Sequence, residues 1–275
     1  MSNNVLYPRK YRVLVQTQSG AAFDVSQLRC TFQVERAMNQ RPNLAKIRVY
    51  NLTPELQNTI IQERDRVVVE AGYDGPQYGV IYEGEILQTL ASRENVVDYR
   101  LTMLALDGGA FLNYGMISGS YAAGSGLRQV VDDSLSKVTI PAQAGQISQE
   151  FGQRPLSRGK VVFGLAGDYY RQMAQSEGAV FYVDGGKVNL VRATDPPAGE
   201  VVELSPASGL VGTPAQTQYG VSAKCLLNPR LTLGALVKIT GEIQGQELQL
   251  GQMVRPLDPG GMYRIIKITH TGDTM

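Results

Sequence analysis

Two pairs of carboxylates in this sequence could carry out acid–base chemistry: Glu83 with Glu85, and Asp132 with Asp133. Glu83 and Glu85 lie two residues apart in an alternating segment, so both project from one face of a predicted strand. Paired carboxylates can hydrolyse a glycosidic bond when their separation in space fits the reaction. Adjacent acids on a strand or helix are more often a solvated face. We therefore predict that neither pair is catalytic.

His270 is the single histidine of the chain, and it lies near the C-terminal end. One imidazole cannot build a histidine-rich metal site, and any catalytic triad would have to use this residue. It alternates with Ile266 and Ile268, which predicts a histidine at a strand end or at an interface. Cys30 and Cys225 lack the paired spacing of a zinc site. Each lies in an alternating apolar segment, so both are predicted to be small buried hydrophobic residues, and no secretory feature supports a disulfide between them.

The segment "GQRPLSRGKV", which contains Gly152 and Gly159, superficially resembles a phosphate-binding loop. It places six residues between the two glycines, and Val161 stands where a Ser or Thr should hold magnesium. The glycine-rich segment 118–126 lacks the spacing of a dinucleotide-binding turn. The sequence therefore predicts no catalytic residue, no cofactor site and no metal site, and a protein that is not an enzyme.

The charges of the chain are almost balanced, with 26 Lys and Arg against 25 Asp and Glu in 275 residues. This balance argues against a dedicated nucleic-acid binder, an acidic tail or a polybasic membrane anchor. The N-terminal "MSNNVLYPRKYRV" has no apolar signal core, and no run approaches the roughly 20 apolar residues of a membrane span. We therefore expect synthesis and folding in a cytoplasm. Thirty glycines, fourteen tyrosines and no tryptophan fit a chain rich in strands and turns.

The elements that must position these residues are mostly strands. In residues 46–56, "KIRVYNLTPEL", the alternation of Ile47 and Val49 with polar residues predicts a half-buried strand that ends at Asn51. A polar helical stretch from Glu55 to Arg64 follows, and then the strand "RVVVEAGY". Five or six such short strands up to about residue 112 predict a barrel or a sandwich.

The middle of the chain has a different texture. "MISGSYAAGSG" reads as an exposed glycine-rich loop, and "LRQVVDDSLSKV" has the apolar spacing of an amphipathic helix. "AGDYYRQMAQSEG" predicts a second helix with Tyr169, Tyr170 and Met173 toward a core. "AVFYVDGGKVNLV" predicts a β-hairpin that turns at residues 184–186, and "DPPAGE" marks a boundary near residue 196.

The last part returns to strands and repeats the order of the first: strand, Asn–Pro turn, leucine, strand, glycine, strand. This echo predicts two related β-modules that flank an α/β insertion. The predicted domains are a first tube-like β-barrel module (1–112), a glycine-rich loop with a small helical insertion (113–165), a small α/β domain (166–196) and a second tube-like β-barrel module (197–275). Long strand edges starting at Val67 and Val237 are predicted to pair subunits.

From about Tyr11 to Thr274 the sequence resembles the baseplate hub proteins of contractile-tailed bacteriophages. The resemblance is carried by "LAKIRVYNLTPEL", "VVVEAGYDGPQYGVIYEGEI", "DYRLTMLALDGG" and "GVSAKCLLNPRLTLGALVKITG…GMYRIIKITHTGDT". Its most specific parts are the Asn51-Leu52-Thr53 strand exit, Ala71-Gly72-Tyr73 with Gly84, and the Leu227-Asn228-Pro229 turn. Related chains often continue past "HTGD" with an aromatic-rich strand. The stop at Met275 therefore puts closure of the last β-module in question unless a partner supplies its edge.

The resemblance implies a structural protein of the virion, with two tail-tube-type β-barrels in each subunit. It implies a homotrimer that forms a pseudo-sixfold adapter between the hexameric tail tube and the trimeric central spike, and that encloses part of the DNA channel. The implied partners are the spike, tail-tube or tube-initiator proteins, other baseplate proteins and the tape measure protein. Genomic DNA would pass without specific binding, so we expect a neutral or mildly acidic lumen. The location implied is the tail baseplate, assembled in the host cytoplasm during tail assembly, as in other contractile injection systems.

Three alternatives remain open from sequence alone. A tail-associated protein that binds or degrades peptidoglycan would need a carboxylate pair in a cleft, for which Glu83 and Glu85 are the candidates. A carbohydrate- or receptor-binding β-protein would expose aromatic platforms, and the absence of tryptophan weakens this hypothesis. A tail-tube protein proper would be shorter, with one β-module.

Overall fold

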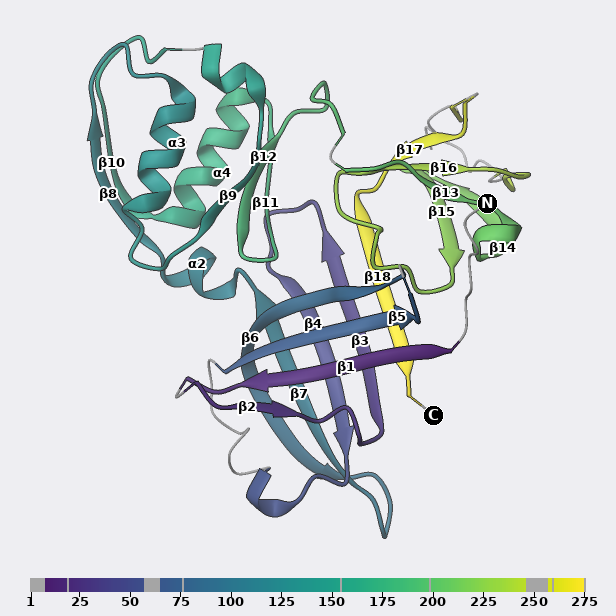
Figure 1. Ribbon diagram of the computed structural model, residues 1–275. Helices are drawn as coiled ribbons and strands as arrows, with labels where there is room; N and C mark the ends of the chain where they lie inside the picture. Colours follow the sequence, from purple (N-terminus) through teal and green to yellow (C-terminus); the bar gives the residue numbers. More distant parts are fainter. Residues whose placement is uncertain are drawn as a thin grey trace.

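The structure is a computed structural model that describes residues 8–18, 20–56, 65–75, 77–153, 155–197, 199–245, 257–258 and 260–274. Figure 1 shows three regions: a large sheet, a unit of helices and short strands, and a smaller β region. We call them the large sheet, the α/β unit (residues 109–191) and the C-terminal β region (residues 202–264). The fold is mainly β with few helices, as the sequence predicts.

The large sheet has eight antiparallel strands in the order β18-β3-β4-β7-β6-β5-β1-β2. The strands are β1 (Arg9–Gln16), β2 (Ala22–Asp24), β3 (Cys30–Ala37), β4 (Asn43–Tyr50), β5 (Arg66–Tyr73), β6 (Tyr78–Arg93), β7 (Tyr99–Asp107) and β18 (Lys267–Asp273). Residues 54–56 are helical, and the rest of the helical stretch predicted after Asn51 lies outside the described residues.

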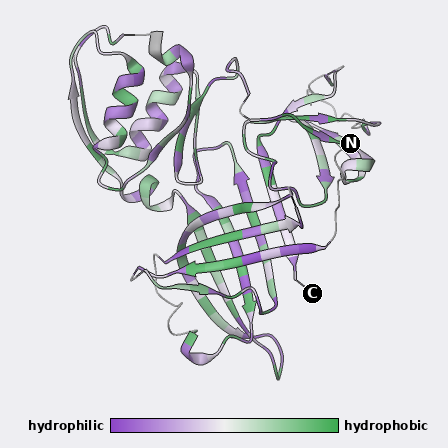
Figure 2. Cartoon of the chain, in the orientation of Figure 1, coloured by the Kyte–Doolittle hydropathy of each residue, from purple (hydrophilic) through white to green (hydrophobic). Residues whose placement is uncertain are grey.

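Alternation along most of the strands gives the large sheet a buried apolar inner face and a more polar outer face. On β4, Ala45, Ile47 and Val49 are fully buried while the residues between them are polar or partly exposed. Figure 2 shows this alternation as stripes across the strands. Val13 of β1 and Phe32 of β3 belong to the same core cluster, although their strands lie toward opposite ends of the sheet order. The sheet therefore curls around one core, and each fully buried Val, Ile or Leu side chain stabilises it by about 1.5–3 kcal/mol.

Hydrogen bonding does not close this curled sheet into a barrel among the described residues. β18 pairs only with β3, and β2 pairs only with β1. The described strands thus leave two open edges. The sequence predicts a closed barrel, and these strands do not form one. The predicted edge at Val67 is wrong because β5 lies inside the sheet between β1 and β6. An alternating strand has the same pattern at an edge and in the interior, so sequence cannot separate the two.

In the α/β unit, the helices α3 and α4 lie between a two-stranded ribbon and a three-stranded sheet (Figure 1). The elements are α2 (Gly109–Tyr114), β8 (Met116–Tyr121), α3 (Leu127–Ser136), β9 (Gln143–Ile147), the 3-10 helix η1 (Gln149–Gln153), β10 (Lys160–Leu165), α4 (Ala166–Glu177), β11 (Val180–Asp184) and β12 (Lys187–Val191). Both predicted helices and the predicted hairpin are confirmed. Residues 116–121, expected in an exposed loop, instead form β8, because β10 pairs with them along six positions.

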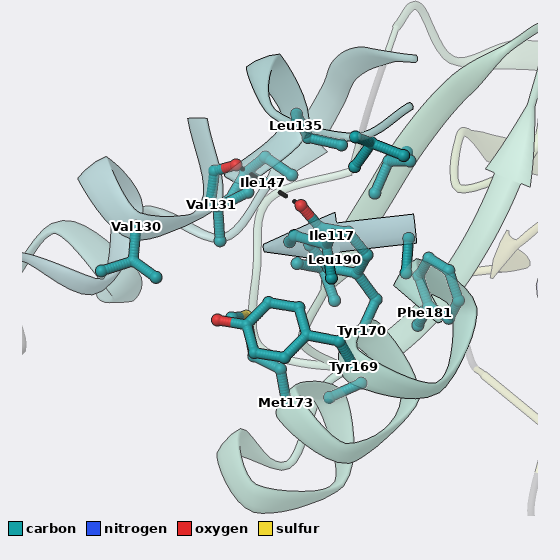
Figure 3. Packing of buried hydrophobic residues seen from close by; sticks show 14 of the residues in the cluster. Ile117, Val130, Val131, Leu135, Ile147, Tyr169, Tyr170, Met173, Phe181 and Leu190 are labelled. Carbon is teal, nitrogen blue, oxygen red and sulfur yellow. Dashed lines mark hydrogen bonds between the residues drawn. The ribbon is translucent and has the colours of Figure 1, made fainter. Parts of the chain in front are cut away.

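The core of the α/β unit is aromatic at its centre (Figure 3). Tyr170 is fully buried, and its ring lies 6.0 Å from that of Phe111, 5.3 Å from Tyr169 and 5.7 Å from Phe181 between centroids. Its hydroxyl is hydrogen-bonded to Ser134 of α3, which also lies in the interior. The prediction that Tyr169, Tyr170 and Met173 face a core is confirmed.

The C-terminal β region contains β13 (Val202–Leu204), the 3-10 helix η2 (Pro206–Ser208), β14 (Leu210–Thr217), β15 (Gly220–Cys225), β16 (Leu236–Ile239) and β17 (Met262–Arg264). β16 lies between β13 and β17. The prediction of a strand edge starting at Val237 is therefore wrong. The last strand, β18, leaves this region and pairs with β3 along seven positions. The segment "KITHTGD", predicted to complete the 197–275 module, thus completes the large sheet instead.

Candidate assembly surfaces

The predicted carboxylate pairs lie on solvated faces. Glu83 and Glu85 are on the outer face of β6, and the Glu83 carboxylate forms an ion pair with Arg66 of β5. Asp132 and Asp133 are on α3, where each pairs with a basic residue one helical turn away, Arg128 and Lys137 respectively. Exposed ion pairs of this kind contribute little to stability. Glu83, Asp132 and Asp133 thus each have a cation partner. None of the four carboxylates lines the groove between β10 and α4.

His270 lies in the middle of β18 and points to the inner face of the large sheet, opposite Val34. Its side chain is 6% exposed, and burial together with nearby Arg36 lowers its pKa to about 4. The expected strand end is wrong for this residue. The strand continues to Asp273 because β3 supplies hydrogen-bonding partners as far as Thr31.

The other nucleophilic and metal-ligating residues that the structure describes form no site. Cys30 and Cys225 are both free thiols, and burial raises the pKa of the Cys30 thiol to about 12, so it is a poor nucleophile. Nowhere in the described part of the chain do three His, Cys, Asp or Glu side chains gather in a way that could hold a metal ion. Gly159 is followed by strand β10 and not by the helix that a phosphate loop requires. No helix of the described residues is long and apolar enough to cross a membrane.

Close backbone approach explains the Ala71-Gly72-Tyr73 segment, one of the distinctive segments of the sequence. Gly72 has a φ of 151°, and a Cβ atom at this position would lie 1.8 Å from the carbonyl oxygen of Gln77. The same carbonyl accepts a hydrogen bond from the Tyr73 N–H at 3.0 Å and closes the β5–β6 turn. Glycine is required here by space as well as by backbone conformation.

A buried polar contact joins the large sheet to the α/β unit. Asp107 at the end of β7 accepts hydrogen bonds from the backbone N–H groups of Gly185 (2.6 Å) and Gly186 (2.9 Å) in the β11–β12 turn. The Arg36 guanidinium of β3 binds both carboxylate oxygens of Asp184, at 2.9 and 2.7 Å. Burial raises the pKa of Asp107, and the two N–H donors oppose that effect. We call this contact the turn clamp; it fixes how the two regions sit against each other.

The outer face of the large sheet neutralises much of its own charge. Arg12 pairs with Asp24 at 2.9 Å and Lys267 pairs with Glu35 at 3.8 Å. With Arg66 and Glu83, these pairs spread from β18 to β2 across the sheet. Lys46 and Arg48 of β4 are without an ion pair in the described part of the chain. Three cations of this face are thus neutralised within the sheet, whereas Lys46 and Arg48 are not.

The β6–β7 hairpin extends the large sheet beyond its other strands, and its turn is held by side chains. Asn51 has a φ of 57°, in the left-handed region that asparagine tolerates better than most residues. Its side-chain amide donates to the Asp98 carboxylate at 2.9 Å and its side-chain oxygen accepts from the Tyr99 N–H at 3.0 Å. Hydrogen bonds from Asn51 and Asn95 lower the pKa of Asp98. The strand exit noted in the sequence therefore holds a hairpin that lies far from it along the chain.

This held turn, residues 94–98, presents two apolar side chains to solvent. Val96 is 90% exposed and Val97 is 78% exposed. The oxygen of the Asn95 side chain accepts from the N–H groups of Val97 (2.8 Å) and Asp98 (2.7 Å), so the turn has a defined shape. We call residues 94–98 the hairpin tip.

A second exposed apolar row lies on the β8–β10 ribbon of the α/β unit. Val161 and Phe163 are each 80% exposed, and Met116 of β8 is partly exposed on the same face. Sequence reasoning missed both apolar surfaces. The signals were the consecutive valines among polar residues in "RENVVDY", and the alternation of Val161 and Phe163 within residues 113–165, which were assigned to a glycine-rich loop and a small helical insertion.

Comparison with known proteins gives this arrangement a context. The family profile described as "Baseplate hub gp41" matches residues 11–246, which is most of the chain. Among curated protein sequences, none matches this chain significantly.

Several solved structures share the fold at very low sequence identity. The 43 kDa tail protein of prophage MuSo2 from Shewanella oneidensis is 10% identical, with a TM-score of 0.60 over 96% of this chain and 94% of that chain. A tail protein from Neisseria meningitidis MC58 is 8% identical, with a TM-score of 0.52 over 96% and 92%. The E. coli c3393 protein is 11% identical, with a TM-score of 0.54 over 98% and 73%. That protein is described as a component of the type VI secretion system with structural similarity to the T4 bacteriophage tail proteins gp27 and gp5.

Proposed function

This chain belongs to the baseplate hub gp41 family, a structural component of the phage tail baseplate, and from that premise we propose that it is a trimeric adapter. Three subunits would form a ring that joins the hexameric tail tube on one side to the trimeric central spike on the other. The family match over residues 11–246 is the observation that carries this proposal. The shared fold of phage tail proteins and of a secretion-system component supports it.

Symmetry gives the physical reason for two β-modules in one subunit. A hexameric tube needs six equivalent contacts, whereas a trimeric spike needs three. Three subunits with two similar modules each would together offer six quasi-equivalent contacts to the tube and three equivalent surfaces to the spike. The tube-type modules and the domain boundaries 1–112, 113–165, 166–196 and 197–275 belong to this proposal, except that β18 completes the first module and not the last. In it, the edges of β2 and β18 that no described strand covers would pair with neighbouring subunits, since unpaired edges favour strand addition.

We further propose that the outer face of the large sheet lines the DNA channel. The cross-strand pairing of Arg12, Lys267 and Arg66 with carboxylates supports this assignment. A face that neutralises its own charge offers few free cations to phosphates, so DNA would pass without being held. A continuous row of unpaired basic side chains around the lumen of the assembled ring would contradict it.

The hairpin tip fits an axial contact in the same assembly. Val96 and Val97 stand on the end of a hairpin that projects beyond the sheet, where they could enter an apolar recess of the ring above or below. The proposed partners are the tail tube or its initiator, the spike, other baseplate proteins and the tape measure protein.

Electron-microscope class averages of the purified chain, viewed end-on, test the proposal. We expect a ring of six similar lobes around a hole, with a mass in solution three times 29.9 kDa. The measurement should be repeated with the spike protein present, because a partner can stabilise a weak ring. Solid particles without a hole under both conditions would overturn the trimeric adapter while leaving the family membership intact.

A further inference from the structure

A groove in the α/β unit runs between strand β10 and helix α4. Its volume is about 460 Å³, and all six residues of β10 line one wall. The other wall is one stripe of α4, made by Tyr169, Gln172, Met173 and Ser176 at helical spacing. A strand edge facing a helix across an open groove has the shape that receives an extended chain.

The edge of β10 that faces this groove is free in the described part of the chain. β10 pairs with β8 alone, along its whole length from Lys160 to Leu165. Each residue of a strand carries one N–H and one C=O, and an edge strand leaves half of them without a strand partner. An added strand would bond to these groups and extend the ribbon.

The exposed side chains of the ribbon are apolar, in contrast to most protected edges. Val161 and Phe163 alternate on the outer face and are each 80% exposed, and Leu165 continues the row at 37%. Natural edge strands usually carry lysines, prolines or bulges that discourage pairing. If an added strand covered these two large apolar side chains, their burial would contribute favourably to the free energy of binding.

One buried polar group beside the groove is without a hydrogen-bond partner in the described part of the chain. Tyr169 is 9% exposed, and its hydroxyl has no hydrogen-bond partner among the described residues. Its ring points away from Phe181 and out of the aromatic centre (Figure 3). Burial raises the pKa of Tyr169, so the hydroxyl stays protonated and available as a donor. This hydroxyl has almost no exposed surface, so a bound segment would supply its acceptor only after a small shift of the neighbouring side chains.

The charge at one end of the groove indicates what the occupant carries. The Lys160 ammonium lies 5.1 Å from the centroid of the Tyr169 ring, and Lys160 forms no ion pair with any described residue. A carboxylate of the occupant at this end would pair with a lysine that is only partly exposed. At the other end, Asp168 is already paired with Arg171 at 2.6 Å. The complementary segment is thus acidic at the Lys160 end.

The edge strands of the large sheet of a second copy do not match these requirements. β2 is three residues long, and the exposed positions of β18 are Lys267, Thr269, Thr271 and Asp273. Neither strand carries an exposed apolar row to set against Val161 and Phe163. The β10 strand of a second copy repeats the apolar row but carries no carboxylate to pair with Lys160. These features favour a segment of another protein.

We propose that the groove between β10 and α4 binds an extended segment of another protein, which adds as a third strand to the β8–β10 ribbon. Alternate residues of the segment are apolar and cover Val161 and Phe163, and a carboxylate near one end pairs with Lys160. This inference does not depend on the subunit number of the hub.

The first experiment places the photo-cross-linker benzoylphenylalanine at position 163 of the full chain, in the cells where the chain is naturally produced. We expect a cross-link to another polypeptide. The same substitution at position 161 should label a residue two positions away in that polypeptide, since a strand repeats every two residues. Tyr219, which is 74% exposed on the turn between β14 and β15, is the control position. A cross-link to a second copy or to DNA, or no cross-link at all, overturns the inference.

The second experiment uses a synthetic peptide of the cross-linked segment and measures its binding to the purified chain by fluorescence anisotropy. Phe163→Glu should weaken binding at least about tenfold, as expected for a central apolar contact, and Lys160→Gln should weaken it severalfold. Tyr219→Glu, the matched control, should leave binding unchanged. All three positions are at least partly exposed, so each variant should keep the wild-type melting curve. Equal binding by Phe163→Glu and wild type would contradict the proposal.

Discussion

The large sheet and the α/β unit solve the same packing problem with different side chains. The core of the large sheet is mostly aliphatic and is contributed by alternate residues of many strands, so no single side chain dominates it. The α/β unit gathers Phe111, Tyr169 and Phe181 around Tyr170. Removal of one core side chain should therefore destabilise the large sheet less than removal of Tyr170 destabilises the α/β unit. The two regions meet at the turn clamp, where polar contacts replace apolar ones.

Truncation of Tyr170 should have the largest effect on stability. Tyr170→Ala leaves a cavity at the meeting point of three rings, and we expect a loss of about 4 kcal/mol in the free energy of unfolding, measured by urea titration. Val13→Ala in the large sheet should cost about 2 kcal/mol, because fewer buried carbons are removed. Tyr170→Phe is the control that removes only the hydroxyl bound to Ser134, at about 1 kcal/mol. Equal losses for Tyr170→Ala and Val13→Ala would break the contrast between the two cores.

Breaking the turn clamp should come next. The side chains of Arg36 and Asp184 are 12% and 17% exposed, so Asp184→Ala leaves a mostly buried cation without its partner. We expect a cost of about 3 kcal/mol in the free energy of unfolding. The two regions should then unfold in separate transitions when followed by intrinsic fluorescence and circular dichroism. Asp168→Ala, which removes an exposed partner of Arg171, should cost about 0.5 kcal/mol or less. A single unchanged transition for Asp184→Ala would show that the clamp does not couple the regions.

Acid should weaken the large sheet through His270. Its folded-state pKa of about 4 lies below the ordinary value of 6.5, so the unfolded chain binds a proton more readily between these two values. The contribution of His270 is therefore complete above pH 6.5 and is lost as the pH falls from 6.5 to 4, by at most about 3 kcal/mol. Asp107 acts in the opposite sense because its pKa is raised, so it stabilises the fold at lower pH. Measuring His270→Gln against wild type over this range isolates the histidine, and parallel pH curves would contradict the prediction.

Release of the hairpin tip should have a smaller and local effect. Asn51→Ala removes two side-chain hydrogen bonds and places alanine at a φ of 57°, for a cost of about 2 kcal/mol. Asn51→Gly tolerates this φ and loses only the hydrogen bonds, so it should cost about half as much. Amide hydrogen exchange should accelerate in residues 94–99 of both variants and stay unchanged in the α/β unit. Exchange that accelerates throughout the large sheet would mean that Asn51 supports the core and not only the tip.

Substitution of the predicted carboxylate pair should have the smallest effect. Glu83→Gln with Glu85→Gln removes one exposed ion pair from the outer face, and we expect a change below about 0.5 kcal/mol in the free energy of unfolding. Infectivity of particles that carry the double variant should equal that of wild type. A loss of infectivity with an unchanged melting curve would revive the peptidoglycan-degrading alternative.

Local patterns determined much of the secondary structure from sequence alone. Alternation revealed β4 and β5, helical spacing revealed α3 and α4, and the Asp184-Gly185-Gly186 turn revealed the β11–β12 hairpin. These features could be predicted because each depends on side chains that are neighbours along the chain or one turn apart. The order of strand motifs was also sufficient to identify the family, which residues 11–246 match.

Only the tertiary structure decided which strands are neighbours. β18 pairs with β3 across more than 200 residues, and β10 turns the glycine-rich segment 116–121 into a strand. The same distance hides the role of Asn51, whose side chain holds Asp98 and Tyr99 of a distant hairpin. A half-buried strand shows the same alternation whether its partner strand is near in the sequence, far in the sequence or absent. Alternation shows which face of the strand is buried, but it does not show which strand pairs with it. Edges, grooves and exposed apolar rows, the surfaces through which an assembly protein acts, are for that reason decided by the folded chain.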